Sequence, residues 1–235
     1  MEEISLGEGQ INVLKYSPKG TFLGLGTSSG DIIFWPALER DENKPIKCSS
    51  KGITFLAFNQ SENLIAFSDE IQVIGILKSD QLSWKIDARV KVHTKTITGI
   101  TFTNEKDLFS IGLDRKICHI EDNILKLRRT VDKFSDPILI NHCQDFLIIG
   151  TSNRQIRFVN PETLLTRRIL DSPGIPKAIF QPKFGHCIFI CEEGIVIGDS
   201  DWPTTVDFWN IASQGLLKVH FLVIEYLFVQ SFNSI

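Results

Sequence analysis

The chain has 235 residues, of which 43% are hydrophobic and 23% are charged, a composition typical of globular proteins. Its formal net charge of −3 does not indicate nucleic-acid binding, which is favoured by an overall basic field. The acidic start, MEEISLGEGQ, predicts no secretory signal peptide, and no apolar run is long enough to predict a membrane span. Five cysteines without a signal peptide predict reduced thiols and a cytoplasmic or nuclear location.

A unit of about 40 residues recurs along the chain. Each copy contains three short runs rich in Ile, Val and Phe, bounded by turn residues, and these runs predict β-strands. Most of the runs are almost wholly apolar, as expected for strands that are covered on both faces. In chain order, the predicted strands are residues 11–18, 22–26 and 31–35; 53–60, 64–68 and 71–76; 97–104, 108–112 and 116–120; 137–142, 146–150 and 155–159; and 176–182, 187–191 and 194–198.

An aromatic residue closes the first predicted strand of four units, at Tyr16, Phe58, Phe102 and Phe180. A unit of three or four strands cannot bury its own faces, so neighbouring units have to stack to form a continuous core. The period of about 40 residues is that of a four-stranded propeller blade. The repeat therefore predicts an all-β scaffold built from stacked blades.

The stretch GLGTSSGDIIFW, residues 24–35, raises an alternative, because its three glycines resemble a phosphate-binding loop. Its spacing, G-x-G-x-x-x-G, is one residue longer than the dinucleotide-binding fingerprint. It also leads into a predicted strand, whereas a phosphate loop needs the free N–H groups of a helix N-terminus. We therefore predict that this stretch is the turn of a β-hairpin.

The units resemble WD repeats, most clearly in residues 93–122, HTKTITGITFTNEKDLFSIGLDRKICHIED. In that family a His opens the first strand, a small residue lies in the second, an Asp lies in the next turn and Trp-Asp closes the third. His93, Ser110 and Asp114 match this pattern, and Ile120 stands where the family has Trp. The resemblance implies that these three residues form a buried structural hydrogen-bond network, not a catalytic one.

The resemblance covers roughly residues 11–210, although no unit keeps all four residues of the pattern. FSIGLDRKI is similar to a unit of the WD-repeat adaptor that recruits γ-tubulin complexes. NLIAFSDEIQVIG and NRQIRFVNPETL are similar to parts of a small propeller nucleoporin of the outer ring of the pore.

The resemblance implies an all-β β-propeller of about five to six four-stranded WD-type blades. The family most often closes its ring with about seven blades, so the propeller is irregular, is open and completed by a partner, or belongs to a longer protein. We divide the chain into an N-terminal extension, residues 1–10, the WD-repeat propeller, residues 11–210, and an apolar tail, residues 211–235. The tail is a candidate closing strand.

Residues with catalytic or metal-binding chemistry are sparse. His186, Cys187 and Cys191 form the best metal-like cluster, but the two cysteines fall roughly 13 Å apart along one predicted strand, too far for one ion. We expect buried thiols there, and His142–Cys143 has no partner pair nearby. The sequence has no Ser nucleophile elbow, paired His motif or catalytic carboxylate constellation. We therefore predict no catalytic residue, no metal, no cofactor and no small-molecule substrate.

Two basic groupings follow predicted closing strands, where we expect exposed loops between blades. Solvated loop charge explains them, and the alternative is a basic rim that contacts an acidic partner or nucleic acid. Two further arginines occupy equivalent turns of neighbouring units and are expected on the same rim. The candidate interaction rim comprises Arg115, Arg154, Lys126, Arg128, Arg129, Arg167 and Arg168, with Lys133 nearby.

These features predict a non-enzymatic protein-interaction scaffold, a subunit or adaptor of a larger multiprotein complex. One alternative is a nucleic-acid-associated propeller in ribosome or chromatin assembly, which the basic groupings favour and the net charge does not. A second alternative, favoured less, is an enzyme built on a propeller.

Overall fold

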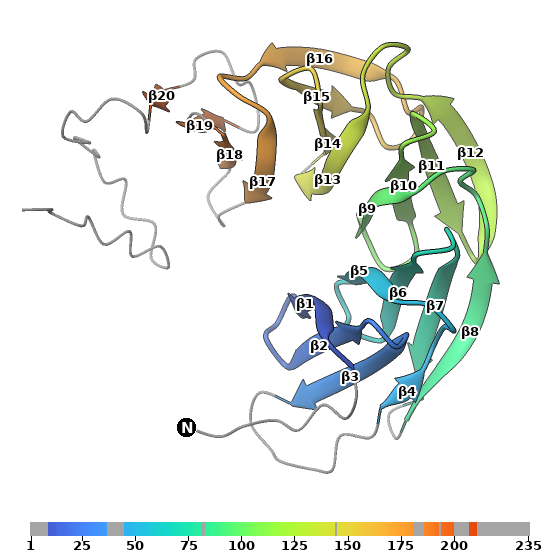
Figure 1. Cartoon of the computed structure of the whole chain (residues 1–235). Helices are drawn as coiled ribbons and strands as arrows, with labels where there is room; N and C mark the ends of the chain where they lie inside the picture. Colours follow the sequence, from blue (N-terminus) through green and yellow to red (C-terminus); the bar gives the residue numbers. More distant parts are fainter. Residues whose placement is uncertain are drawn as a thin grey trace, which may run out of the picture.

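The computed structural model describes residues 9–36, 45–80, 83–143, 145–180, 186–192, 194–199 and 207–210. These residues form twenty β-strands in five four-stranded sheets. Each sheet consists of four consecutive strands, which pair antiparallel with their neighbours in chain order, and the sheets follow one another around an open arc (Figure 1). The predicted all-β architecture of four-stranded blades is confirmed.

The strands have the following bounds. The first sheet contains β1 (Ile11–Tyr16), β2 (Phe22–Thr27), β3 (Asp31–Pro36) and β4 (Ile46–Lys47), and the second contains β5 (Ile53–Phe58), β6 (Leu64–Asp69), β7 (Ile74–Ser79) and β8 (Trp84–Val90). The third contains β9 (Ile97–Phe102), β10 (Leu108–Gly112), β11 (Lys116–Glu121) and β12 (Ile124–Thr130). The fourth contains β13 (Pro137–Cys143), β14 (Phe146–Thr151), β15 (Gln155–Val159) and β16 (Thr166–Asp171), and the fifth contains β17 (Pro176–Phe180), β18 (His186–Cys191), β19 (Gly194–Asp199) and β20 (Asp207–Asn210).

The first strand of each sheet lies on the concave side of the arc, and in the first four sheets the fourth strand lies on the convex side (Figure 1). The inner strands β1, β5, β9, β13 and β17 contact one another in sequence. The aromatic residues predicted to close the first strands are the last residues of β1, β5, β9 and β17.

Hydrophobic cores lie between successive sheets, as the stacking argument requires. Phe34 and Phe67 belong to the core between the first and second sheets, and Phe109 and Leu147 to the core between the third and fourth. Middle strands are buried on both faces, so β10 is buried at all of its residues and β6 at all but the first. Full burial of an Ile or Phe side chain stabilises the fold by about 1.5–3 kcal/mol. This explains why the middle strands are almost wholly apolar.

The glycine-rich stretch is a β-hairpin, as predicted, because β2 pairs antiparallel with β3 across it. Gly30 lies in the hairpin turn with a φ of 87°. A side chain there would place its Cβ 2.2 Å from the carbonyl oxygen of Ser49. Glycine is therefore required at this turn by both backbone conformation and space.

The fourth strands β12 and β16 correct the sequence analysis, which placed their basic residues in exposed loops, and β8 is a further fourth strand that the sequence analysis did not identify. In β8 and β16 burial alternates strictly, with half-buried residues separated by exposed ones. In such strands one set of alternate side chains lies against the rest of the fold and the other set is exposed to solvent. Because half of their residues are polar or charged, they do not form the apolar runs that identified the other strands.

The apolar tail, residues 211–235, and the first eight residues lie outside the described residues. In the part of the chain that the structure describes, no helix has the length and apolar character needed to cross a membrane.

Candidate protein-interaction surfaces

A buried polar network ties the third sheet to the loop that precedes it. The Nδ1 atom of His93 lies 2.9 Å from Oδ1 of Asp114, and Nε2 lies 2.8 Å from Oγ of Ser110. The backbone N–H of Thr94 donates a further hydrogen bond of 3.1 Å to Oδ2 of Asp114. Burial raises the pKa of Asp114, but the hydrogen bonds from His93 and Thr94 outweigh it and hold the pKa below its usual value.

In three other described sheets, the polar residue that ends the second strand forms hydrogen bonds with the following turn. Thr27 accepts a hydrogen bond from the backbone N–H of Asp31, and Thr151 donates one to the carbonyl of Gln155. Asp69 accepts hydrogen bonds from two N–H groups of its own turn and one from the hydroxyl of Ser49. By contrast, His93, Ser110 and Asp114, the residues indicated by the WD resemblance, are in direct hydrogen-bond contact at the third sheet.

The seven residues of the predicted rim do not lie on one surface, which corrects the sequence analysis. Arg115 and Arg154 occupy equivalent turns between the second and third strands of neighbouring sheets, with φ values of 62° and 63°. The side chain of Arg115 donates a hydrogen bond of 2.8 Å to Asp136 and a second to the carbonyl of Lys133. The other five residues lie on the fourth strands β12 and β16, which run along the convex side of the arc (Figure 1).

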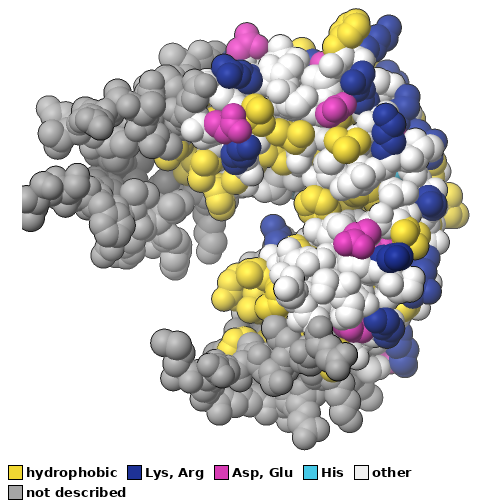
Figure 2. All heavy atoms as spheres, viewed as in Figure 1, with side chains coloured by type: hydrophobic (Ala, Val, Ile, Leu, Met, Phe, Trp, Pro, Cys, Tyr) yellow, Lys and Arg dark blue, Asp and Glu magenta, His cyan; other side chains and the backbone are white. Residues whose placement is uncertain are grey.

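The fourth strands carry a concentration of positive charge, which we call the basic outer belt. Lys and Arg side chains gather along the convex edge formed by β8 and β12 (Figure 2). The strands β4, β8, β12 and β16 together contain only two acidic residues, Asp87 and Asp171. The belt consists of Lys47, Lys85, Arg89, Lys126, Arg128, Arg129, Arg167 and Arg168.

Strand β12 holds the densest part of the belt, with Lys126, Arg128 and Arg129 all exposed. Lys126 lies 3.5 Å from a carboxylate oxygen of Glu121 on the adjacent strand, and both side chains are exposed. Ile124, at the start of β12, is 61% exposed. The strand pairs only with β11, so its outer edge presents unpaired backbone groups beside the cations.

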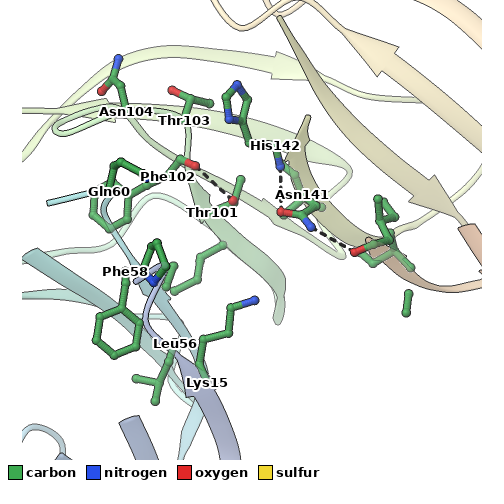
Figure 3. Close-up of a pocket in the computed structure, with 17 residues that line it drawn as sticks. Lys15, Leu56, Phe58, Gln60, Thr101, Phe102, Thr103, Asn104, Asn141 and His142 are labelled. Carbon is green, nitrogen blue, oxygen red and sulfur yellow. Dashed lines mark hydrogen bonds between the residues drawn. The ribbon is translucent and has the colours of Figure 1, made fainter. Parts of the chain in front are cut away.

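A cavity of about 410 Å³ opens on the concave side, between the inner strands. Lys15 and Leu56 lie on one side of it, and Asn141 and His142 lie on the other (Figure 3). The side chain of Asn141 donates a hydrogen bond of 3.1 Å to the carbonyl of Ile179. No Asp, Glu, Ser or Cys is among the described residues that line this cavity.

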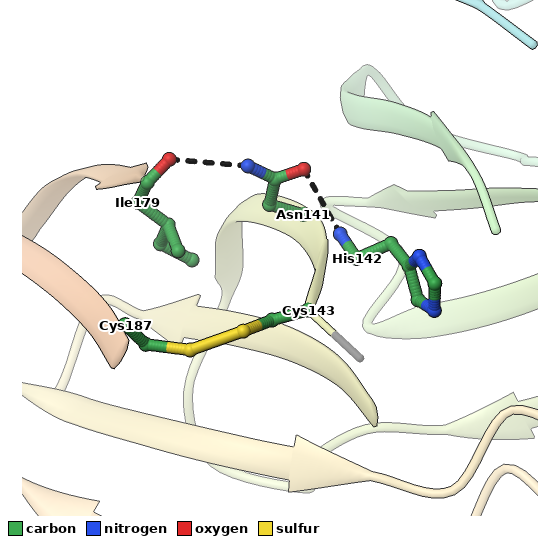
Figure 4. The surroundings of a disulfide bond; sticks show 5 residues. All are labelled: Asn141, His142, Cys143, Ile179 and Cys187. Carbon is green, nitrogen blue, oxygen red and sulfur yellow. Dashed lines mark hydrogen bonds between the residues drawn. A yellow bond between two sulfur atoms is a disulfide. The ribbon is translucent and has the colours of Figure 1, made fainter. Parts of the chain in front are cut away.

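The cysteines correct another expectation. Cys143 and Cys187 form a disulfide between the first strand of the fourth sheet and the second strand of the fifth (Figure 4). The prediction of reduced thiols is wrong for this pair, which lies 44 residues apart in the sequence. Burial raises the pKa of Cys48 to about 12 and that of Cys118 to about 11, which keeps both as thiols. Cys191 is also free and buried.

The sequence analysis could not pair Cys143 with Cys187, because the two residues belong to different units. Only the stacking of the units brings their strands together. Among the described side chains, no group of three or more His, Cys, Asp and Glu could hold a metal ion.

Solved propellers match the fold closely. A chain of the mitotic checkpoint complex superposes with a TM-score of 0.74 at 14% identity, covering 87% of this chain and 65% of that one. The β-propeller domain of Cps50 (Swd1) from Myceliophteria thermophila gives 0.73 at 13% identity, covering 86% and 71%. No family model matches the chain. The five stacked sheets and these likenesses show that the chain has a β-propeller fold.

Its distant sequence relatives are ciliary proteins. Cilia- and flagella-associated protein 251 of Mus musculus is 26% identical over 188 residues, which cover 70% of this chain and 14% of that protein. The protein of the same name from Pongo abelii is 24% identical over 201 residues, covering 74% and 17%. The chain therefore matches only a small part of the length of these relatives.

Proposed function

We propose that the chain is a non-enzymatic protein-interaction subunit of a ciliary or flagellar multiprotein assembly, and that its basic outer belt holds an acidic partner. The belt carries the proposal. A chain with a net charge of −3 places eight Lys and Arg and only two Asp on four outer strands. Charge gathered on one surface steers and orients an oppositely charged partner.

Outer strands also need protection from unwanted pairing, and exposed lysines on an edge strand provide it. That role accounts for the single Lys on β4 and for part of the charge on β8. It does not account for three exposed cations on β12 beside Ile124, which is 61% exposed. Cations next to exposed apolar area are typical of a binding surface for a protein with acidic and apolar side chains.

The ciliary setting rests on the names of the sequence relatives, cilia- and flagella-associated protein 251 of two mammals. We accordingly assign the chain to cilia or flagella and to partners within their assemblies.

A nucleic-acid partner is the second candidate, because the same cations would contact phosphates. Sequence-tolerant binding of single strands also uses exposed aromatic side chains for base stacking. Trp84 is the one aromatic residue of the four outer strands, and it is half-buried, with its ring 4.9 Å from that of Phe34. The outer strands therefore favour a protein partner.

The test is purification of the tagged chain from ciliated cells at low and high salt, with mass spectrometry of the retained proteins. The variant carries Lys126→Glu, Arg128→Glu and Arg129→Glu. The control carries Lys51→Glu, Lys91→Glu and Lys95→Glu, three exposed lysines outside the belt and of equal total charge change. We expect the β12 variant to lose ciliary proteins by about 10-fold or more while the control retains them.

Retention of the same proteins by both variants would contradict the proposal. Nuclease treatment separates the two candidate functions. Proteins that remain after nuclease treatment support the protein partner, whereas release by nuclease together with recovered RNA supports the alternative.

A further inference from the structure

Phe134 is the most exposed of the large hydrophobic side chains that the structure describes, at 89%. It lies in the loop of residues 131–136, which joins the outer strand β12 to the inner strand β13 of the next sheet. A single exposed apolar residue on a mobile loop needs no explanation. This loop, however, is fixed by charged and backbone hydrogen bonds on both sides of Phe134.

Asp132 fixes the loop on one side of the phenylalanine. Its carboxylate accepts a hydrogen bond of 2.7 Å from the backbone N–H of Phe134. The same carboxylate forms an ion pair with Arg157 of β15, and only 9% of the Asp132 side chain and 12% of the Arg157 side chain are exposed. A buried charge pair of this kind is costly to break, so the backbone of Phe134 is held against the fourth sheet.

Arg115 and Ser152 fix the other side. Arg115, from the third sheet, donates hydrogen bonds to the carbonyl of Lys133 and to the carboxylate of Asp136. The backbone N–H of Asp136 donates a hydrogen bond of 3.0 Å to Oγ of Ser152, and the N–H of Ser152 donates one of 2.9 Å to the carbonyl of Asp136. Both neighbouring sheets therefore hold the loop while its aromatic ring stays in solvent.

We propose that Phe134 is the anchor of a second protein-interaction site, and that its partner presents an apolar pocket edged by carboxylates. The proposal rests on the proposed role as a protein-interaction subunit and adds a site outside the basic outer belt. A fixed loop loses little conformational entropy on binding, so the apolar contact of its aromatic ring adds to affinity almost in full. Aromatic anchors on rigid supports are typical binding hot spots.

Charge indicates the kind of pocket. The two acidic residues of the loop, Asp132 and Asp136, are paired with Arg157 and Arg115. Lys133, next to the phenylalanine, is exposed and adds positive charge at the edge of the site. A pocket with carboxylates at its margin is therefore complementary to the ring and to the ammonium group together.

The experiment uses the full chain, with Phe134 replaced by the photoreactive analogue p-benzoylphenylalanine in ciliated cells. The cross-linked protein is identified, its cross-linked segment is mapped, and the purified protein is titrated with the wild-type chain. We expect the segment to line an apolar pocket that contains Asp or Glu. Phe134→Ala should weaken binding at least about 30-fold, and Phe134→Leu by less than about 5-fold.

Three controls keep the result specific. Ile169→Ser removes an apolar side chain that is 45% exposed on β16 and should leave the affinity for the cross-linked protein unchanged. Lys133→Glu should weaken binding at low salt and less at high salt. The melting temperature of Phe134→Ala should match that of the wild-type chain, because the ring is almost wholly in solvent.

Equal affinity of Phe134→Ala and the wild-type chain overturns the inference, as does a cross-link only to a second copy of this chain. Binding of the wild-type chain, but not Phe134→Ala, to vesicles of phosphatidylcholine and phosphatidylserine also overturns it, because the ring then inserts into lipid. If the β12 charge variant loses its partners while Phe134→Ala loses none, the proposed function stands and this second site fails. If neither variant loses a partner, both fail.

Discussion

The imidazole of His93 bridges Asp114 and Ser110 and so connects the loop before the third sheet with the sheet itself. Asp114 lies 21 residues beyond His93, in the turn between β10 and β11. Because the ring is only 1% exposed, each of its nitrogens needs a partner from the protein. The hydrogen bonds to Asp114 and Ser110 thus take the place of the hydrogen bonds that the His93 ring would form with water in the unfolded chain.

Removal of the carboxylate should destabilise the fold without affecting either interaction surface. In Asp114→Ala, His93 loses the acceptor for Nδ1 and Thr94 loses the acceptor for its N–H, at a cost of about 2 kcal/mol. We expect the melting temperature to fall by roughly 5 °C, measured by calorimetry or circular dichroism. An unchanged melting temperature would show that the network is dispensable.

Acidification should weaken the fold through the same carboxylate. The pKa of Asp114 is lower in the folded chain than its usual value. Burial raises this pKa, but the hydrogen bonds from His93 and Thr94 outweigh the effect of burial. The resulting stabilisation is complete above the ordinary aspartate pKa of about 3.9 and is lost as the pH falls through the folded value. Urea unfolding at pH 6 and at lower pH should show this loss, and it should be smaller in Asp114→Asn. Identical pH dependence in the two proteins would contradict the role given to this group.

The disulfide should make stability depend on reductant. Cys143 and Cys187 close a loop of 44 residues between neighbouring sheets, which corresponds to about 4 kcal/mol in the loop-closure treatment. We expect dithiothreitol, or Cys143→Ser with Cys187→Ser, to lower the urea midpoint. Cys191→Ser is the matched control, since it removes a free thiol from the same core and should leave the effect of dithiothreitol intact. Equal midpoints with and without reductant in the wild-type chain would argue against the bond.

Two glycines with positive φ should respond differently to alanine. At Gly20, φ is 74° and no heavy atom lies within 4 Å of an added Cβ, so Gly20→Ala should cost about 1 kcal/mol for the backbone alone. At Gly30 the added Cβ would also meet the carbonyl of Ser49 at 2.2 Å, so Gly30→Ala should cost at least about 3 kcal/mol. Denaturant unfolding of both variants tests this, and equal costs would contradict the clash at Ser49.

The sequence predicts the inner three strands of each sheet, although β7 (Ile74–Ser79) was expected three residues earlier, at residues 71–76. The prediction works because strands such as β6 and β10 are covered on both faces and are almost continuously apolar. The fourth strands escape this pattern. In β12, ILKLRRT, four of seven residues are polar or charged, since the strand is exposed at the convex edge. Hence the sequence alone identifies the basic residues but places them in loops.

Contacts between residues of different units also cannot be predicted from the spacing of residues in the sequence. Arg115 and Asp136 meet because neighbouring units stack, as do Cys143 and Cys187. The sequence predicts the contact between His93 and Asp114 because the WD pattern, which these residues match, implies that they are hydrogen-bonded. Phe134 gave no signal of its own, since one phenylalanine in a short polar segment resembles a residue of any surface loop.

The most direct measurement is binding of the purified chain to demembranated ciliary axonemes by co-sedimentation at increasing salt. The wild-type chain should sediment with the axonemes at low salt and be released as the salt concentration rises, because contacts between exposed charges are screened. The variant with Lys126→Glu, Arg128→Glu and Arg129→Glu should stay in the supernatant, while the Lys51, Lys91 and Lys95 control should bind like wild type. Equal sedimentation of the wild-type chain and the β12 variant would contradict the role of the basic outer belt.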